Sequence, residues 1–407
     1  MDSMEVFMVR DFDNILDYIY HYGDLTFEEE PFNDVDNLIF AVFAYFPLED
    51  FEPKGKDFKA KTLQDICVDY LSSTSLKFIS STMPNWMKKS IFLAMAFLKR
   101  KRYCNLMVTH FDSDFSHEDN TQFAGVCLEL NNKECVVAFR GTDNSWLGFK
   151  EDFFLCCYDS VPAQQKAAEF LHNCMYHKRH HTFKVMGHSK GGCLSVYAAL
   201  SLSERYQRRI DKIYSDDGPG LSLQARLSEG YKRISDKIVR LIVKDDLVGL
   251  LLNYDAPTYI IDSYSKGSFL AAHDSYNWKI NGKEFVKVPD ITLVSKYLSK
   301  TIDDWLNYSV SSVEERILII NALFDAIEQT EFTQPGKVLD DPFGFILQFY
   351  KYLSKDKSNK KLIAASMRKF GTKFLDNYIR YQRAKIKQSV ENKANKKTEE
   401  KELIEND

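Results

Sequence analysis

One short segment, Gly187-His-Ser-Lys-Gly191, limits the folds open to this chain more than any other part of the sequence. It has the form G-x-S-x-G, follows the apolar stretch 182–186 and precedes the small and apolar stretch 191–205. A turn this tight between a strand and a helix needs glycine on either side of the serine, because a Cβ there would collide with nearby backbone. The segment therefore predicts a strand–turn–helix unit that exposes Ser189 as the candidate nucleophile.

The residues around this turn alternate between strand-like and helix-like patterns. Helices are expected at 161–175 and 191–205, and strands at 122–130, 134–140, 182–186, 211–215, 238–243 and 258–263. The first two strands flank Asn131-Asn-Lys133, which is typical of a hairpin. Alternation of this length predicts an α/β fold with a mostly parallel sheet and helices on both of its faces.

The two ends of the chain have helical patterns. Helix starts are expected near Asn33, Pro84, Ser312, Asp341 and Lys360, the last helix running to about residue 390. We expect the charged tail 391–407, which lacks aromatic residues, to be disordered. The chain then divides into a helical segment packed on the core (1–100), a catalytic core (101–290), a helical region that forms a cap or interaction surface (291–390), and the tail.

A nucleophilic serine needs a base and an acid. Of nine histidines only His273 follows Ser189 in the chain, and sheets of this type place the acid and then the histidine after the serine. Asp246 follows the expected strand 238–243, and Asp217 follows 211–215. Either carboxylate can hold the imidazole in the required tautomer. We favour Asp246 and keep Asp217 as the alternative.

The stretch Phe139-Arg-Gly-Thr142 ends an expected strand in a polar turn. In such a sheet the loop after this strand supplies one donor of an oxyanion hole, and the residue after the nucleophile supplies the other. We therefore expect the backbone N–H groups of Thr142 and Lys190 to form this hole, with the Thr142 hydroxyl as an optional donor. The Lys190 side chain is expected to point into solvent, although a cation there would also suit an anionic or polar head group.

Together these motifs resemble the class 3 lipases, a branch of the α/β-hydrolases. Their pattern is matched by Phe139–Thr142, Gly187–Gly192, Asp246–Val248 and His273–Tyr276. Over about residues 10–290 the chain is more similar to the uncharacterised, mostly Firmicute, Mbeg1-like proteins, including at 217–220 and 248–252.

The resemblance implies an α/β-hydrolase fold with a helical C-terminal extension. It also implies Ser189 as nucleophile, His273 as base and Asp246 as acid. Members of the closer family often carry serines where Asp245 and Asp246 stand here, which keeps Asp217 in contention.

These residues predict a serine ester hydrolase of the lipase or esterase type, which forms an acyl-enzyme on a small-molecule or lipid ester such as a lysophospholipid. The alternatives are a non-catalytic hydrolase fold used for binding or as a scaffold, and an acyltransferase, thioesterase or peptidase with the same triad. We find no nucleotide-binding motif and no metal-ligand spacing, so neither cofactor nor metal is expected.

Composition limits the kinds of binding partner and the cellular compartment that we expect for this protein. The net charge of −4 argues against a dedicated nucleic-acid binder. Eight cysteines without framework spacing favour a reducing compartment. The first residues lack a signal-peptide pattern, and the longest apolar runs, 38–47 and 91–98, are too short for a membrane span. We therefore expect a cytoplasmic protein, leaving open signal-less secretion, peripheral membrane contact and the oligomeric state.

Overall fold

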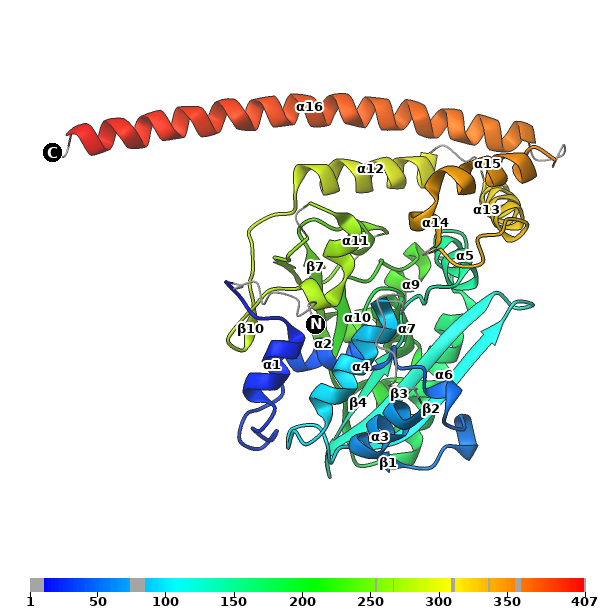
Figure 1. Ribbon diagram of the computed structural model, residues 1–407, viewed down its shortest axis with the longest axis vertical. Coiled ribbons are helices and arrows are strands. Elements are labelled where there is room, and N and C mark those ends of the chain that lie inside the picture. Colours follow the sequence, from blue (N-terminus) through cyan, green and yellow to red (C-terminus); the bar gives the residue numbers. More distant parts are fainter. Residues whose placement is uncertain are drawn as a thin grey trace, which may run out of the picture.

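An eight-stranded sheet forms the centre of the computed structural model (Figure 1). The structure describes residues 11–73, 85–252, 255–265, 267–308, 312–335, 337–355 and 360–405. In spatial order the strands are β1 (Lys61–Thr62), β2 (Met107–Ser116), β3 (Thr121–Asn131), β4 (Glu134–Phe139), β5 (Thr182–Gly187), β6 (Ile210–Asp216), β7 (Ile238–Val243) and β8 (Thr258–Ile261). β1 to β4 pair antiparallel, whereas β4 to β8 pair parallel. All six predicted strands, the predicted hairpin and the mostly parallel sheet are confirmed.

β2 is absent from the predicted strands because polar side chains interrupt its apolar pattern. Asp112 and Asp114 lie opposite Gly125 and Phe123 of β3, while Phe111 is buried. Pairing with a long neighbouring strand, rather than local apolar alternation, holds this segment in the sheet.

Helices from the N-terminal part of the chain cover one face of the sheet (Figure 1). They are α1 (Ile15–Tyr22), α2 (Asp34–Phe43), α3 (Leu63–Ser73) and α4 (Asn85–Phe97). α2 begins at the expected place, since Asn33 and Asp36 form a capping box. The expected start of α4 at Pro84 lies outside the described residues.

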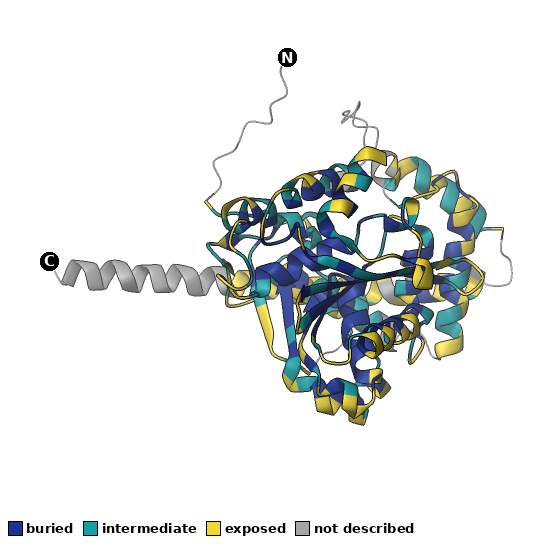
Figure 2. Cartoon of the chain, turned by 90° about the horizontal axis from the view of Figure 1, so that it is seen from below, coloured by how far each residue is buried: buried dark blue, intermediate teal, exposed yellow. Residues whose placement is uncertain are grey.

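Helices that follow β4 cover the other face. They are α5 (Trp146–Phe154), α6 (Pro162–His177), α7 (Lys190–Ser201), α8 (Glu204–Gln207), α9 (Leu223–Leu227) and α10 (Glu229–Ile234). In Figure 2 the dark blue, buried strands lie between these helices and the N-terminal ones, whose outer sides are yellow. This three-layer arrangement, with an antiparallel edge and a parallel half, is the α/β-hydrolase fold.

A buried ion pair ties the N-terminal segment to the core. The Arg102 guanidinium contacts the Asp36 carboxylate at 2.5 Å, and both side chains are fully buried. Arg102 also donates to the backbone carbonyls of Leu25, Thr26 and Glu30. One cation therefore fixes the loop before α2 as well as the first turn of that helix.

The remaining elements lead to a helical C-terminal region. They are α11 (Phe269–His273), β9 (Ile280–Asn281), β10 (Glu284–Phe285), α12 (Leu293–Tyr308), α13 (Val313–Glu328), α14 (Lys337–Asp340), α15 (Pro342–Leu353) and α16 (Lys360–Glu405). Helix α16 packs along α12 and runs across the top of Figure 1. It extends past residue 390 into the segment expected to be disordered, because the lysine- and glutamate-rich sequence there has high helix propensity. Across the described residues, no helix has both the length and the apolar character needed to cross a bilayer.

Candidate active site

The turn Gly187–Gly191, which we call the elbow, joins β5 to α7 as predicted. Ser189 has φ 59° and ψ −133°, a conformation that costs a non-glycine residue about 1–3 kcal/mol. A Cβ on Gly187 would lie 2.2 Å from the Gly191 carbonyl, and one on Gly191 would lie 2.2 Å from the Phe139 oxygen. The two glycines therefore let the chain turn sharply enough to place Ser189 above the strand ends.

The surroundings of Ser189 leave its hydroxyl available. Its backbone N–H donates to the Asp216 carbonyl at 2.9 Å, which joins the elbow to the end of β6. Among the described residues the Ser189 hydroxyl has no hydrogen-bond partner, and the residue is 9% exposed. At the start of α7 the N–H groups of Gly191 and Gly192 donate to the carbonyls of His188 and Ser189, at 3.0 and 2.8 Å. Among the described residues the Lys190 N–H has no backbone acceptor, so it is suited to bind a negative charge.

Two aspartates meet at one nitrogen of His273. The Nδ1 atom lies 2.7 Å from Asp246 Oδ2 and 3.0 Å from Asp217 Oδ2. Asp217 follows β6, Asp246 follows β7, and His273 ends α11, so three separate segments converge here. Both carboxyls are buried, at 0% and 2% exposure respectively. The sequence left a choice between the two acids, and the structure brings both to the imidazole.

Burial and charge set the protonation of this cluster. Burial, together with the charge of Asp246, raises the pKa of Asp217 well above its ordinary value. Burial also opposes ionisation of Asp246, but a hydrogen bond from Asp217 and the charge of His273 outweigh it and lower the Asp246 pKa. Burial disfavours the imidazolium, yet the two carboxyls outweigh that effect and raise the pKa of His273. These directions favour a proton on Asp217, a negative charge on Asp246 and an imidazole that is more basic than usual.

His188, which the sequence indicated only as a spacer in the elbow, connects this cluster to the N-terminal helices. Its Nε2 lies 2.9 Å from the His273 carbonyl oxygen, and its Nδ1 lies 3.2 Å from the Tyr45 hydroxyl. Because a carbonyl can only accept, Nε2 carries the proton and Nδ1 accepts from Tyr45. Burial and the nearby charge of His273 lower the pKa of His188 to about 3, so the ring stays neutral. Only the folded topology reveals this role, since Tyr45 and His188 are far apart in sequence.

The loop after β4 lies directly against the elbow. A Cβ on Gly141 would be 3.0 Å from Ser189 Cβ and 2.4 Å from the His188 carbonyl oxygen. The Thr142 hydroxyl donates to Asp152 Oδ2 at 2.5 Å, which commits its proton. Burial raises the pKa of Asp152 to about 6, although the charge of Lys190 opposes this. The Thr142 hydroxyl is therefore not free to act as an extra oxyanion donor, and the backbone N–H remains.

The sequence led us to expect the Lys190 side chain in solvent, and this expectation is wrong because the side chain is buried. It is 1% exposed and pairs with Glu151 at 2.9 Å. It also donates to the backbone carbonyl of Gln122 at 2.9 Å and to the side-chain oxygen of the same residue at 2.5 Å. The sequence could not reveal this, since Glu151 and Gln122 come from α5 and β3. These contacts hold the lysine in the core and fix the first turn of α7.

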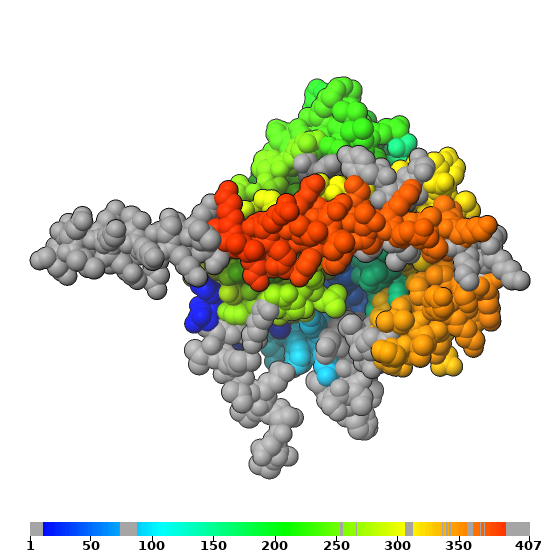
Figure 3. Space-filling model, turned by 90° about the horizontal axis from the view of Figure 1, so that it is seen from above, coloured from blue at the N-terminus to red at the C-terminus, as the bar shows by residue number. Residues whose placement is uncertain are grey.

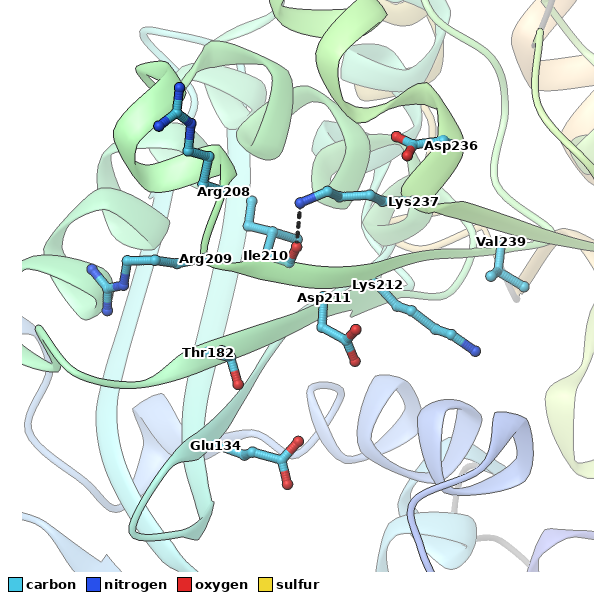
Figure 4. Close-up of a pocket in the computed structure, with 10 residues that line it drawn as sticks. All are labelled: Glu134, Thr182, Arg208, Arg209, Ile210, Asp211, Lys212, Asp236, Lys237 and Val239. Atoms are coloured by element: carbon cyan, nitrogen blue, oxygen red, sulfur yellow. Dashed lines mark hydrogen bonds between the residues drawn. The ribbon is translucent and has the colours of Figure 1, made fainter.

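An open cavity of about 610 Å³ lies at the amino ends of the parallel strands, whereas Ser189 and the aspartates lie at the carboxyl ends (Figure 4). Its lining includes the residues that begin three parallel strands, Glu134, Thr182 and Ile210. Two of the cations there are engaged, as Arg209 donates to three backbone carbonyls and Lys237 donates to that of Ile210 at 2.6 Å. Because Asp217, Asp246 and Ser189 follow the carboxyl ends of strands, this cavity is separate from them, and we assign it no function.

Two groups among the described residues bring three ligand-type side chains within reach of one ion. One is the His273 cluster itself, and the other comprises His110, Cys127 and Cys174. In the second group both thiols are fully buried within the core between the sheet and α6. All eight cysteines are free. The expectation of no metal and no cofactor stays a prediction.

The fold and the elbow define the class of this protein as a lipase-like α/β-hydrolase. A model of the Mbeg1-like family matches residues 97–325, more than half of the chain, and the chain belongs to that family. The predicted family is thus confirmed, whereas the roles of individual residues are not tested by this match.

Solved lipase structures give weaker matches. A fungal lipase is 14% identical, with 63% of this chain and 85% of that chain covered and a TM-score of 0.37. MDLA from Penicillium cyclopium, in a mutant form, is 14% identical, with 61% and 83% covered and a TM-score of 0.36. The lipase of Rhizopus microsporus var. chinensis is 20% identical, with 37% and 61% covered and a TM-score of 0.28. No curated protein matches the sequence.

Proposed function

We propose that this protein is a serine ester hydrolase that cleaves a carboxylic ester, with a lipid or lysophospholipid as the expected class of substrate. The observation that carries the proposal is the convergence of Asp217 and Asp246 on His273 Nδ1, at the edge of the sheet where the elbow holds Ser189. The imidazole is only partly buried, and because the two carboxyls hold its Nδ1, its Nε2 is left to accept a proton, which is the task of a general base.

The mechanism follows from these groups. The Ser189 hydroxyl attacks the acyl carbon while His273 Nε2 takes its proton. The oxyanion that forms accepts hydrogen bonds from the backbone N–H groups of Thr142 and Lys190. His273 then returns the proton to the leaving alcohol, and an acyl-enzyme remains on Ser189. Water, deprotonated by His273, attacks this ester. The bond to the Ser189 oxygen breaks, His273 returns the proton to that oxygen, and the carboxylic acid leaves.

In this mechanism Asp246 is the acid that stabilises the imidazolium. Its contact with Nδ1 is the shorter of the two, at 2.7 Å against 3.0 Å for Asp217. Asp217 stays protonated and donates a hydrogen bond to Asp246, so the two carboxyls together carry one negative charge. A second charge would bind the imidazolium so tightly that His273 would be slow to give up its proton.

A fluorophosphonate probe, which labels activated serines covalently, tests the proposal on the purified full-length protein. Wild type should label, and Ser189→Ala should not label and should lose about 10⁴-fold or more in the turnover of a soluble p-nitrophenyl ester. The matched control is Ser201→Ala, an exposed serine at the end of α7, the helix that follows Ser189, which should label like wild type. Labelling that persists in Ser189→Ala, or a wild type that neither labels nor turns over esters, would refute the proposal.

A further inference from the structure

The outer face of α15 is apolar and exposed. On its inner face Phe345 stacks on Trp146 and on Phe349, which joins the helix to the core. On its outer face four large apolar residues, each 59–77% exposed, recur at i, i+3, i+4 and i+7: Phe343, Ile346, Leu347 and Tyr350. A helix on the surface of a water-soluble protein normally has polar residues on this face, so the stripe requires an explanation.

Helix α16 repeats this arrangement. One face packs on α12, where the Trp305 indole donates to the Ser366 hydroxyl at 3.1 Å and Asn377 donates to Asp304 at 3.2 Å. The opposite face has three apolar residues at i, i+4 and i+11, each 42–65% exposed: Leu375, Ile379 and Ile386. Figure 3 looks down on this side of the molecule, with α16 in orange to red across it and the orange residues of α14 and α15 beside it. Helices α15 and α16 therefore lie on one side of the protein.

The same surface is strongly basic. Residues 360–387 contain nine lysines and arginines and one acidic residue, whereas the whole chain has a net charge of −4. Exposed members include Lys361, Arg368, Arg380, Arg383 and Lys385. Apolar stripes flanked by cations are typical of helices that lie in the interface of an anionic membrane.

We propose that α15 and α16 form a docking surface for a membrane that contains anionic lipids, which we call the C-terminal surface. The apolar side chains would enter the boundary between head groups and acyl chains, and the cations would pair with lipid phosphates. A nucleic acid would also attract the cations but would leave exposed aliphatic side chains such as Ile346, Leu347 and Leu375 in water. The observed combination of side chains therefore favours lipid.

The C-terminal surface belongs to helices that lie near the candidate active site, so docking would bring this site to the membrane. Helix α12 packs against the short helix Val248–Leu250 that follows β7 and Asp246, and α13 packs against α5, which follows Thr142. The C-terminal helices thus lie over the carboxyl edge of the sheet (Figure 1). Docking would hold the elbow close to a lipid substrate; this step alone rests on the proposed hydrolase function.

Co-sedimentation with vesicles tests the binding itself. Full-length Ser189→Ala protein, which cannot degrade the lipids under the proposed function, is mixed with vesicles of phosphatidylcholine or with vesicles of phosphatidylcholine and phosphatidylglycerol in equal parts. We expect binding to the anionic vesicles that is at least about tenfold tighter than to phosphatidylcholine alone. Phe343→Ser with Leu347→Ser, and separately Arg380→Glu with Arg383→Glu, should each weaken that binding at least about tenfold.

The matched control is Leu223→Ser with Leu227→Ser, two leucines of α9 that are 62% and 63% exposed outside the C-terminal surface, and it should bind like the parent protein. Binding that is absent, that the α15 and α16 substitutions leave unchanged, or that appears only with an RNA or DNA duplex would overturn the proposal. Fluorophosphonate labelling of wild type without vesicles runs in parallel. Because it needs no lipid surface, it separates a failure of docking from a failure of the hydrolase proposal.

Discussion

The catalytic core and the C-terminal helices differ in which side chains they bury and which they expose to solvent. The core buries charged groups, as in the pairs Lys190–Glu151 and Arg102–Asp36. The C-terminal helices instead expose large apolar groups, such as Phe343 of α15. A buried charge persists only when every partner is present, whereas an exposed apolar group costs the folded chain little. Substitutions in the core should therefore damage activity or folding, and substitutions on the C-terminal surface should change binding alone.

The largest expected effect lies in the aspartate pair. Asp246→Asn removes the negative charge beside the imidazolium and presents an amide to Nδ1, so kcat/KM for a soluble ester should fall by about 10³–10⁴-fold. In the proposed mechanism Asp217 is protonated, so Asp217→Asn replaces it with a neutral group of the same shape and the loss should stay below about tenfold. Steady-state kinetics of both variants with one p-nitrophenyl ester decide the matter.

The pH dependence of kcat/KM provides the control for this comparison. His273 is a base only when neutral, and its raised pKa means that activity should increase as the pH rises through an alkaline midpoint. Asp246→Asn should lower that midpoint by about one unit or more, whereas Asp217→Asn should leave it within about half a unit. The opposite ranking in rate and midpoint would make Asp217 the ionised acid.

A smaller effect, on stability rather than on chemistry, is expected at the buried ion pair of the N-terminal segment. Arg102→Met leaves the Asp36 carboxylate buried without its partner, so the free energy of unfolding should fall by about 3–5 kcal/mol. Urea denaturation measures this change. The control is Arg208→Met, which breaks an exposed pair with Glu204 and should leave the denaturation midpoint where it is. Equal midpoints for the two variants would mean that the N-terminal segment does not stabilise the core.

The sequence was sufficient for the elbow and for most strands because their signals are local. Gly187 and Gly191 are required by a backbone turn, and strands such as 238–243 are apolar apart from one arginine. His273 could be assigned because no other histidine follows Ser189 in the chain. Local patterns thus predicted the parallel half of the sheet and placed the candidate nucleophile and base on it.

Contacts between distant segments could not be predicted in the same way. The burial of Lys190 depends on Glu151 and Gln122, which lie on other elements. The contact of both aspartates with His273 Nδ1 depends on how far the loops after β6 and β7 extend. Each loop alone has the sequence of an ordinary turn, so the sequence suggested a choice between Asp217 and Asp246 rather than a pair.

The exposure of the apolar stripe on α15 could not be predicted from the sequence for a different reason. Its apolar residues recur with helical spacing whether the face they form is buried or not, so periodicity cannot distinguish core from docking surface. Phe345 and Phe343 are two positions apart on this helix, yet the first packs against Trp146 and the second is 77% exposed. Only the packing of the folded chain separates these roles.

The smallest expected effect follows from this contrast within one helix. Phe343→Ser with Leu347→Ser removes only side chains that already contact water, so the free energy of unfolding should change by no more than about 0.5 kcal/mol. Phe345→Ala, in contrast, opens a gap against Trp146 and should cost about 2 kcal/mol or more. Urea denaturation without vesicles measures both variants, and turnover of a soluble ester by the surface variant should match wild type. If the surface variant instead unfolds as easily as Phe345→Ala, the stripe contributes to the core, and any loss of vesicle binding would follow from unfolding.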